Sequence, residues 1–271
     1  METGANSRQS DAVTIRCLLR LTASFKAVSP LRSATAVQNG AAIRSTLYHH
    51  VSPRHSRIMR CLVTCGPSWE PIDRVRRLTN FSTGRLGLLL SAALADAGHE
   101  VLCLKGEAAT AHGTVPGEIL PFSTNDDLLA KLQAQAGRAG AIFHAAALCD
   151  YRVKSIHAEH GDAVLGAAKI PTRSGNLKLE LEPTVKVLPQ LRALFPAAKI
   201  VGWKYELDGT GDDVIDRALR QIAECATDAC VVNGAAWGDG FGFVVPGKAP
   251  VPLASGEELG KFLCRWLRGE K

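Results

Sequence analysis

Several features that would decide the class of a protein at once are missing from this sequence. No stretch approaches 18 uninterrupted apolar residues, so no membrane-spanning helix is predicted. The eight cysteines form no CxxC pair, whereas zinc sites usually contain closely spaced pairs. We therefore expect them to be small apolar side chains in a reducing cytoplasm. Their positions are Cys17, Cys61, Cys65, Cys103, Cys149, Cys225, Cys230 and Cys264.

Most of the chain also lacks a net charge. Residues 1–58 hold eight of the 32 basic residues and two of the 26 acidic ones, which accounts for the whole net charge of +6. The remainder, 59–271, has 24 residues of each sign. This balance gives no electrostatic reason to expect a nucleic-acid partner.

Methionine is equally scarce, and its placement bears on the N-terminal segment. Residues 1–58 are basic, poor in acids and weakly periodic, which fits an organelle transit peptide or a disordered tail. The only methionines are Met1 and Met59, and Met59 directly precedes the first predicted strand. We favour a third interpretation, an over-extended start that the mature protein lacks. An intact mass from the native source that matches 271 residues would contradict it.

The rest of the chain alternates between two patterns. Apolar, strand-like runs occupy 60–65, 100–104, 118–122, 140–145, 198–203 and 228–233. Helical patterns occupy 85–97, 126–138, 184–194, 212–226 and 256–268. Asn125 is the expected N-cap of the second helix. The alternation predicts an α/β fold, a three-layer Rossmann-like open sheet that is mainly parallel, with helices on both faces.

Open sheets of this kind bind ligands beyond the carboxyl ends of their strands. Three predicted connections lie there: 66–84, 146–175 and 203–211. The second is long, polar and without clear periodicity, which is typical of a functional loop. The alternating stretch 177–181 after it is a candidate strand.

The connection between the first strand and the first helix is crowded with small and polar residues. Helix N-termini present free N–H groups and a partial positive charge, which favour phosphate. The connection is neither a GxxxxGK[ST] loop nor a GxGxxG turn. Dinucleotide-binding proteins also have an acidic residue at the end of the second strand, which binds the ribose, whereas this chain has Lys105 there. We expect an anion site without the dinucleotide signature; a turn of small residues with no ligand is the alternative.

A family resemblance rests on six segments in order. TCGPSWEPIDRVRRLTNFSTGRLG (64–87) resembles the opening signature of phosphopantothenate–cysteine ligases, also called phosphopantothenoylcysteine synthetases. Matching segments follow at HAAALCDYR (144–152), AAKIPTRSGNLKLEL (167–181), PTVKVL (183–188), KIVGWKYEL (199–207) and DACVVNG (228–234). The resemblance covers residues 59–271, so this range is the predicted ligase-like α/β domain.

The resemblance implies a ligase of coenzyme A biosynthesis. In this reaction the carboxylate of the substrate 4′-phosphopantothenate would attack the α-phosphate of CTP or ATP and release pyrophosphate. The amine of L-cysteine would then attack the acyl nucleotidylate. Mg²⁺ and a homodimer that shares segments near the site are also implied. Many bacterial members carry a flavin-dependent decarboxylase domain, for which residues 1–58 are too short and irregular. We therefore expect no flavin, and a yellow purified protein would contradict this.

The resemblance also assigns site residues. The proposed catalytic pair is Asn80, whose amide would donate to the acyl intermediate, and Lys169, placed on the triphosphate. Arg76, Asn80 and Lys186 would bind substrate, and Asp150 is the metal candidate. The implied nucleotide-binding residues are Gly66, Ser82, Gly84, Gly87, Ala145, Ala146, Asp150, Lys169, Trp203 and Asn233.

The sequence departs from the family pattern in the helix before the sixth strand. That helix carries Arg217 and Arg220 where the family often has lysines, and the exchange is not conservative. Trp203 and Val185 replace a phenylalanine and a proline.

Two other functions therefore remain open. A nicotinamide-dependent oxidoreductase is opposed by the missing GxGxxG and the missing acid. A non-catalytic binder of nucleotide or pantothenate metabolites is supported only by the absent lysines.

Overall fold

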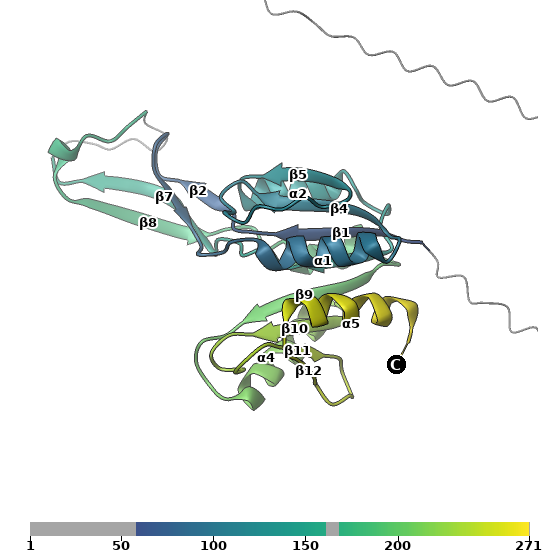
Figure 1. The fold of residues 1–271 in the computed structure, drawn as a ribbon. Helices are drawn as coiled ribbons and strands as arrows, with labels where there is room; N and C mark the ends of the chain where they lie inside the picture. The colour runs from purple at the N-terminus through teal and green to yellow at the C-terminus, as the bar shows by residue number, and fades with distance from the viewer. Residues whose placement is uncertain (1–57, 161–167, 271) are drawn as a thin grey trace, which may run out of the picture. The chain divides into compact units, whose positions relative to one another are not determined.

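The computed structural model describes residues 58–160 and 168–270. The predicted N-terminal extension lies outside the described residues except for Ile58. The prediction of an α/β fold is confirmed: an eight-stranded sheet carries helices on both faces (Figure 1). Among the described residues, no helix combines the length and the apolar character that crossing a bilayer requires.

The central sheet has the strand order β12-β11-β10-β9-β6-β1-β4-β5. The six strands from β10 to β5 in this order are mutually parallel, whereas β11 pairs antiparallel with both β10 and β12 at one edge. The strands are β1 (Arg60–Cys65), β4 (Glu100–Gly106), β5 (Glu118–Phe122), β6 (Ala141–His144), β9 (Lys199–Tyr205), β10 (Ala229–Asn233), β11 (Phe241–Val244) and β12 (Val251–Leu253). Sequence reasoning missed β11 and β12.

Alternate side chains of the buried strands feed two separate cores. On β1, Val63 packs with α1 and α5, while its neighbour Leu62 packs with α2 and α3. This alternation of apolar residues is what strands covered on both faces require. The helices are α1 (Arg85–Asp96), α2 (Asn125–Gln133), α3 (Leu191–Leu194), α4 (Gly211–Cys225) and α5 (Gly256–Arg268), with 3₁₀ turns η1 (Thr172–Ser174) and η2 (Leu188–Gln190).

Two helix predictions need correction. The N-cap of α2 is Thr124, whose hydroxyl accepts from the Asp127 N–H, and not Asn125. Asn125 is instead the first helical residue, with a buried side chain that bonds elsewhere. The helix predicted at 184–194 is only η2 followed by the single turn α3, because Pro189 lacks the N–H that a longer helix needs.

Two hairpins lie outside the central sheet. The first joins β2 (Trp69–Pro71) to β3 (Arg77–Thr79), and the second joins β7 (Tyr151–Ala158) to β8 (Leu177–Pro183). The strand predicted at 177–181 is confirmed, whereas the prediction that 146–175 is all loop is wrong because β7 lies within it. A small apolar cluster joins the two hairpins.

The order of the strands reverses between β1 and β6. The chain leaves β1 toward β4 on one side, whereas it leaves β6 toward β9 on the other. Ligands of doubly wound sheets bind at such a switch point, beyond the carboxyl ends of the strands. The predicted connections after β1, β6 and β9 all begin at this edge.

Candidate active site

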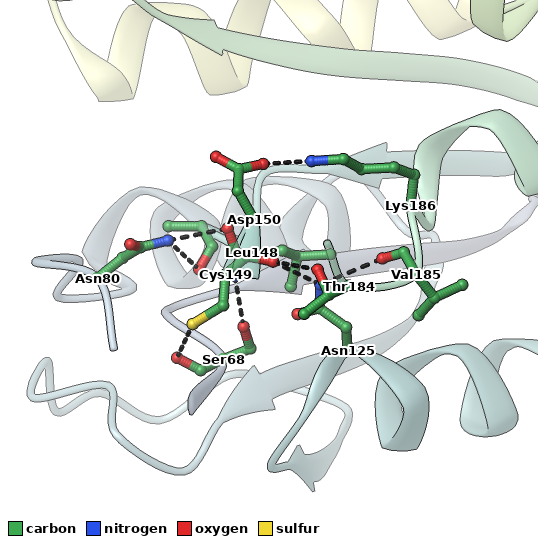
Figure 2. Close-up of polar contacts among 10 residues, drawn as sticks. Ser68, Asn80, Asn125, Leu148, Cys149, Asp150, Thr184, Val185 and Lys186 are labelled. Carbon is green, nitrogen blue, oxygen red and sulfur yellow. Dashed lines mark hydrogen bonds and ion pairs between the residues drawn. The ribbon is translucent and has the colours of Figure 1, made fainter. Parts of the chain in front are cut away.

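The connections after β1 and β6 remain paired beyond the strands. The Ser68 N–H donates to the Ala147 carbonyl at 3.2 Å, and the Cys149 N–H donates to the Ser68 hydroxyl at 2.8 Å. Ser68 is fully buried, so it acts as an internal tie between the two connections (Figure 2). Sequence reasoning did not single it out.

The side chain of Asn80 is hydrogen-bonded to the connection after β6. Its Nδ2 donates to the carbonyls of Ala147 at 3.2 Å and Leu148 at 2.9 Å. An amide has two hydrogens on this nitrogen, so both have backbone acceptors and Oδ1 is the atom left for a ligand. The site therefore presents Asn80 first as an acceptor, and donation to an acyl oxygen would require it to release one carbonyl.

Asn125 ties the two connections that carry Asp150 and Lys186. Its Nδ2 lies 2.8 Å from the Cys149 carbonyl, 2.9 Å from the Thr184 hydroxyl and 3.2 Å from the Val185 carbonyl (Figure 2). Its side chain is 1% exposed. Because Cys149 precedes Asp150 and Val185 precedes Lys186, this buried amide positions both charged residues.

Asp150 and Lys186 form an ion pair, so two predicted site residues lie together. Their side chains are 73% and 58% exposed, and an ion pair this exposed contributes little to stability. Each residue can therefore release its partner and bind a charged group of a ligand instead.

A cavity of about 500 Å³ extends from this ion pair toward α4. This volume is in the range of small-molecule sites. Of its cationic residues, Arg217 is bound by Glu206 at 2.5 Å and by the Asp208 carbonyl, and Lys204 pairs with Glu206. Arg220 has no ion pair among the described residues. The other lining residues include Asn125, His144, Ala146, Asp150, Lys186, Trp203, Gln221 and Glu224.

His144 is a further lining residue that sequence reasoning missed. It ends β6, its ring is 6% exposed, and its Nδ1 lies 2.8 Å from the Thr64 hydroxyl. Burial lowers the pKa of His144 to about 4, so the ring is neutral at physiological pH. A polar residue at the end of an otherwise apolar strand was the available signal.

Backbone conformation or close packing excludes larger residues at three glycines of the first connection. Gly66 and Gly84 have φ of 78° and 77°, and a Cβ on Gly66 would lie 2.6 Å from that of Ala109. A Cβ on Gly87 would lie 2.1 Å from that of Cys65, so α1 sits directly on β1. Ser82 is half-buried in the turn before α1, where its N–H donates to the Asn80 carbonyl.

Lys169 does not line the cavity; it belongs to the region of the two hairpins. Its neighbour Ile170 packs in the apolar cluster between them. Arg76 donates to the Ile170 carbonyl at 2.5 Å and pairs with Asp73 at 3.0 Å, and Asp73 accepts from the Ile170 N–H at 3.1 Å. That N–H is the main reason why the pKa of Asp73 lies below its ordinary value. Arg76 therefore holds the segment that carries Lys169.

The remaining predicted residues are divided between the cavity and its surroundings. Ala146 lines the cavity, and the Ala145 N–H donates to the Thr64 carbonyl, so Ala145 continues the pairing of β6 with β1. Trp203 lines the cavity and also packs against the core on the face of α1 and α5. Asn233 ends β10, where its carbonyl accepts from the Glu206 N–H, and it is not a lining residue.

A metal site made of protein groups alone is not part of this arrangement. Among residues 58–160 and 168–270, no group of three or more His, Cys, Asp or Glu side chains could hold a metal ion. The seven cysteines in these ranges are free, and burial raises the pKa of Cys61 and Cys230 to about 12. These thiols are therefore apolar packing groups, as predicted.

Comparison with known proteins decides the family. The DNA/pantothenate metabolism flavoprotein C-terminal domain matches residues 57–246. The chain belongs to this family. The predicted resemblance is thereby confirmed over most of the chain's length.

Individual relatives agree with this assignment. The coenzyme A biosynthesis bifunctional protein CoaBC of Thermococcus kodakarensis is 28% identical over 202 residues, which are 71% of this chain and 46% of that protein. The chain thus spans about half the length of this relative. The crystal structure of the DNA/pantothenate metabolism flavoprotein from Streptococcus pneumoniae has a TM-score of 0.68 and 25% identity, and the match covers 78% of this chain and 99% of that one.

A third comparison shows the fold alone. A Cab2 mutant in complex with phosphopantothenate-cysteine has a TM-score of 0.62 at 20% identity, and the match covers 78% of this chain and 86% of that one.

Proposed function

We propose that this protein is a phosphopantothenate–cysteine ligase of coenzyme A biosynthesis. The observation that carries the proposal is the placement of Asn80, Asp150 and Lys186, which the resemblance assigns to the site: they lie on connected segments at the switch point, beside a cavity of small-molecule size. The family membership and the relatives named for coenzyme A biosynthesis support it.

The proposed reaction has two balanced steps. A carboxylate oxygen of 4′-phosphopantothenate forms a bond to the α-phosphorus of CTP or ATP, and the bond to pyrophosphate breaks. The amine nitrogen of L-cysteine then bonds to the acyl carbon and loses a proton, while the carbon–oxygen bond to the nucleoside monophosphate breaks. The protein must hold the anions together and stabilise the charge that develops at phosphorus and at the acyl oxygen.

We assign the charged groups of the cavity to these tasks. Lys186 and Arg220 would bind phosphate oxygens, because the first has only an exposed partner and the second has no ion pair among the described residues. Asn80 would lie at the acyl group, where Oδ1 can accept from the cysteine amine. The N-terminus of α1, with Ser82, Gly84 and Gly87, would bind a further phosphate.

Lys169 lies with the hairpins and not at the cavity. In our proposal a second copy of the chain brings the two together in a homodimer. Exposed apolar side chains near the site, such as Phe81 and Tyr151, are available to pack in such an interface. Light scattering of the full chain should then give twice the chain mass; a monomer would remove this role from Lys169.

Mg²⁺ fits the donor set as a shared ligand of protein and substrate. Mg²⁺ usually keeps several waters and binds through one or two carboxylates plus substrate phosphates. Asp150 offers one exposed carboxylate beside the cavity. When bound, the ion would neutralise part of the triphosphate charge.

An oxygen-label experiment tests the proposed intermediate. With ¹⁸O in the carboxylate of 4′-phosphopantothenate, attack at the α-phosphorus transfers one label to the nucleoside monophosphate. Label in inorganic phosphate would instead show attack at the terminal phosphate. Label that stays in the substrate, with no product formed, would favour a non-catalytic binder, an alternative that the position of Lys169 outside the cavity keeps open.

A further inference from the structure

Two polar side chains, His144 and Gln221, line the cavity. His144 on β6 pairs in register with Gly202 on β9, so the two residues are neighbours on one face of the sheet. The amide of Gln221, from α4, fills the space above Gly202: a Cβ there would lie 2.6 Å from Gln221 Nε2. Gly202 therefore allows Gln221 to lie beside His144, and both residues line the cavity.

The tautomer of His144 follows from its surroundings. The Thr64 hydroxyl accepts from the Ala146 N–H at 3.3 Å and lies 2.8 Å from His144 Nδ1. Thr64 is fully buried, and Nδ1 is the only acceptor that the described residues offer its hydroxyl hydrogen. The hydroxyl therefore donates to Nδ1, and the proton of the neutral ring is on Nε2. His144 thus brings an N–H donor to the cavity.

Gln221 is oriented in the complementary way. Its Nε2 lies 3.5 Å from the Trp203 carbonyl and 3.5 Å from Cys230 Sγ. The opposite amide orientation would bring Oε1 against the Trp203 carbonyl oxygen, which is repulsive. Oε1 is therefore the acceptor that remains for a ligand beside the His144 donor.

We propose that His144 and Gln221 read the base of the nucleoside triphosphate. The His144 Nε2–H donates to a ring nitrogen, and Gln221 Oε1 accepts from the adjacent exocyclic amino group. Cytosine (N3 and the 4-amino group) and adenine (N1 and the 6-amino group) present this pattern. Uracil and guanine present the reverse, a ring N–H beside a carbonyl oxygen, and would oppose donor to donor and acceptor to acceptor.

This inference rests on the proposed function, since it names the donor that the ligase site accepts. It also explains two chain features that the reaction does not need, a buried histidine and a glutamine packed on a glycine. A site built for hydrogen bonds rejects a ligand that leaves its buried groups unpaired. We expect discrimination of about 100-fold between the amino bases and the oxo bases.

The test measures equilibrium binding of CTP, ATP, UTP and GTP to the full chain, together with pyrophosphate release in the presence of 4′-phosphopantothenate and cysteine. Wild-type protein should bind CTP or ATP about 100-fold more tightly than UTP and GTP. His144→Asn keeps an oxygen for the Thr64 hydroxyl but lacks the Nε2 donor, so this preference should fall to about tenfold or less through weaker CTP and ATP binding. His144→Gln restores a donor near Nε2 and should recover part of the preference. The exposed His112→Asn is the matched control and should retain it.

The outcomes separate this inference from the ligase. Cysteine-dependent pyrophosphate release at equal rates with all four nucleotides would overturn the base reading and leave the ligase in place. Selective binding of CTP or ATP without pyrophosphate release would support the base reading and contradict the ligase. Even where a variant does not fold, equal binding of all four nucleotides by the wild-type protein would overturn the base reading.

Discussion

Replacing Asn125 by alanine tests whether one buried amide holds the site together. The Nδ2 atom has three acceptors within 3.2 Å but only two hydrogens, so two hydrogen bonds are lost at any instant. Each contributes about 1 kcal/mol, and the Val185 carbonyl would lose a partner inside the protein. The Cys149 carbonyl keeps the Thr184 hydroxyl at 2.5 Å. The expected destabilisation is therefore roughly 2–3 kcal/mol.

Thermal unfolding provides the assay. For a domain of this size the loss corresponds to a decrease in Tm of roughly 5–10 °C. Ligase activity measured well below Tm should also fall, because Asp150 and Lys186 would no longer be held by a common partner. Asn176→Ala, at an exposed asparagine of the second hairpin, is the matched control and should leave Tm within about 1 °C. An Asn125→Ala variant with the Tm and the activity of wild type would refute the reasoning.

Lys169→Ala should reduce turnover by on the order of 100-fold, as for loss of one stabiliser of transition-state charge, while the exposed Lys178→Ala should not; equal turnover in the two variants would remove Lys169 from the mechanism. Asn80→Ala should slow the cysteine-dependent step more than the first burst of pyrophosphate, because Oδ1 has no donor among the described residues and can accept from the amine; rapid-quench measurements showing equal loss in both steps would argue against this. The pKa of His144 is lowered by burial from 6.5 to about 4, so in this window the unfolded chain binds a proton that the native protein does not. The free energy of unfolding should therefore decrease by roughly 2–3 kcal/mol as the pH falls through the window, and less so in His144→Asn; parallel pH curves for the two proteins would contradict the assignment.

Sequence patterns predicted the parts of the fold that are regular and buried. The strand at 60–65 and the helix at 256–268 have the observed bounds, because continuous burial and a clear apolar stripe leave little ambiguity. The strand β7 was missed for a physical reason. A bulge between Val153 and Ser155 shifts the register, so the buried residues Val153 and Ile156 are three apart and the alternation of a strand is lost.

Sequence motifs indicated candidate site residues, but they could not indicate the contacts between distant segments that position those residues. Asp150 and Lys186 were predicted from the segments that resemble the family, and the structure shows that they form an ion pair. The tie made by Asn125 joins segments 24 and 60 residues away, which no local pattern records. The position of Lys169 likewise depends on Asp73 and Arg76, more than 90 residues earlier in the chain.

The most direct test of the central claim is pyrophosphate release by the full chain. The reaction would contain Mg²⁺ and 4′-phosphopantothenate, with CTP or ATP, each with and without cysteine. A ligase should give sustained release only when cysteine is present, and the more effective nucleotide would identify the donor. Folded protein that releases no pyrophosphate in any mixture would contradict the ligase, and nucleotide binding would then be the function to explain.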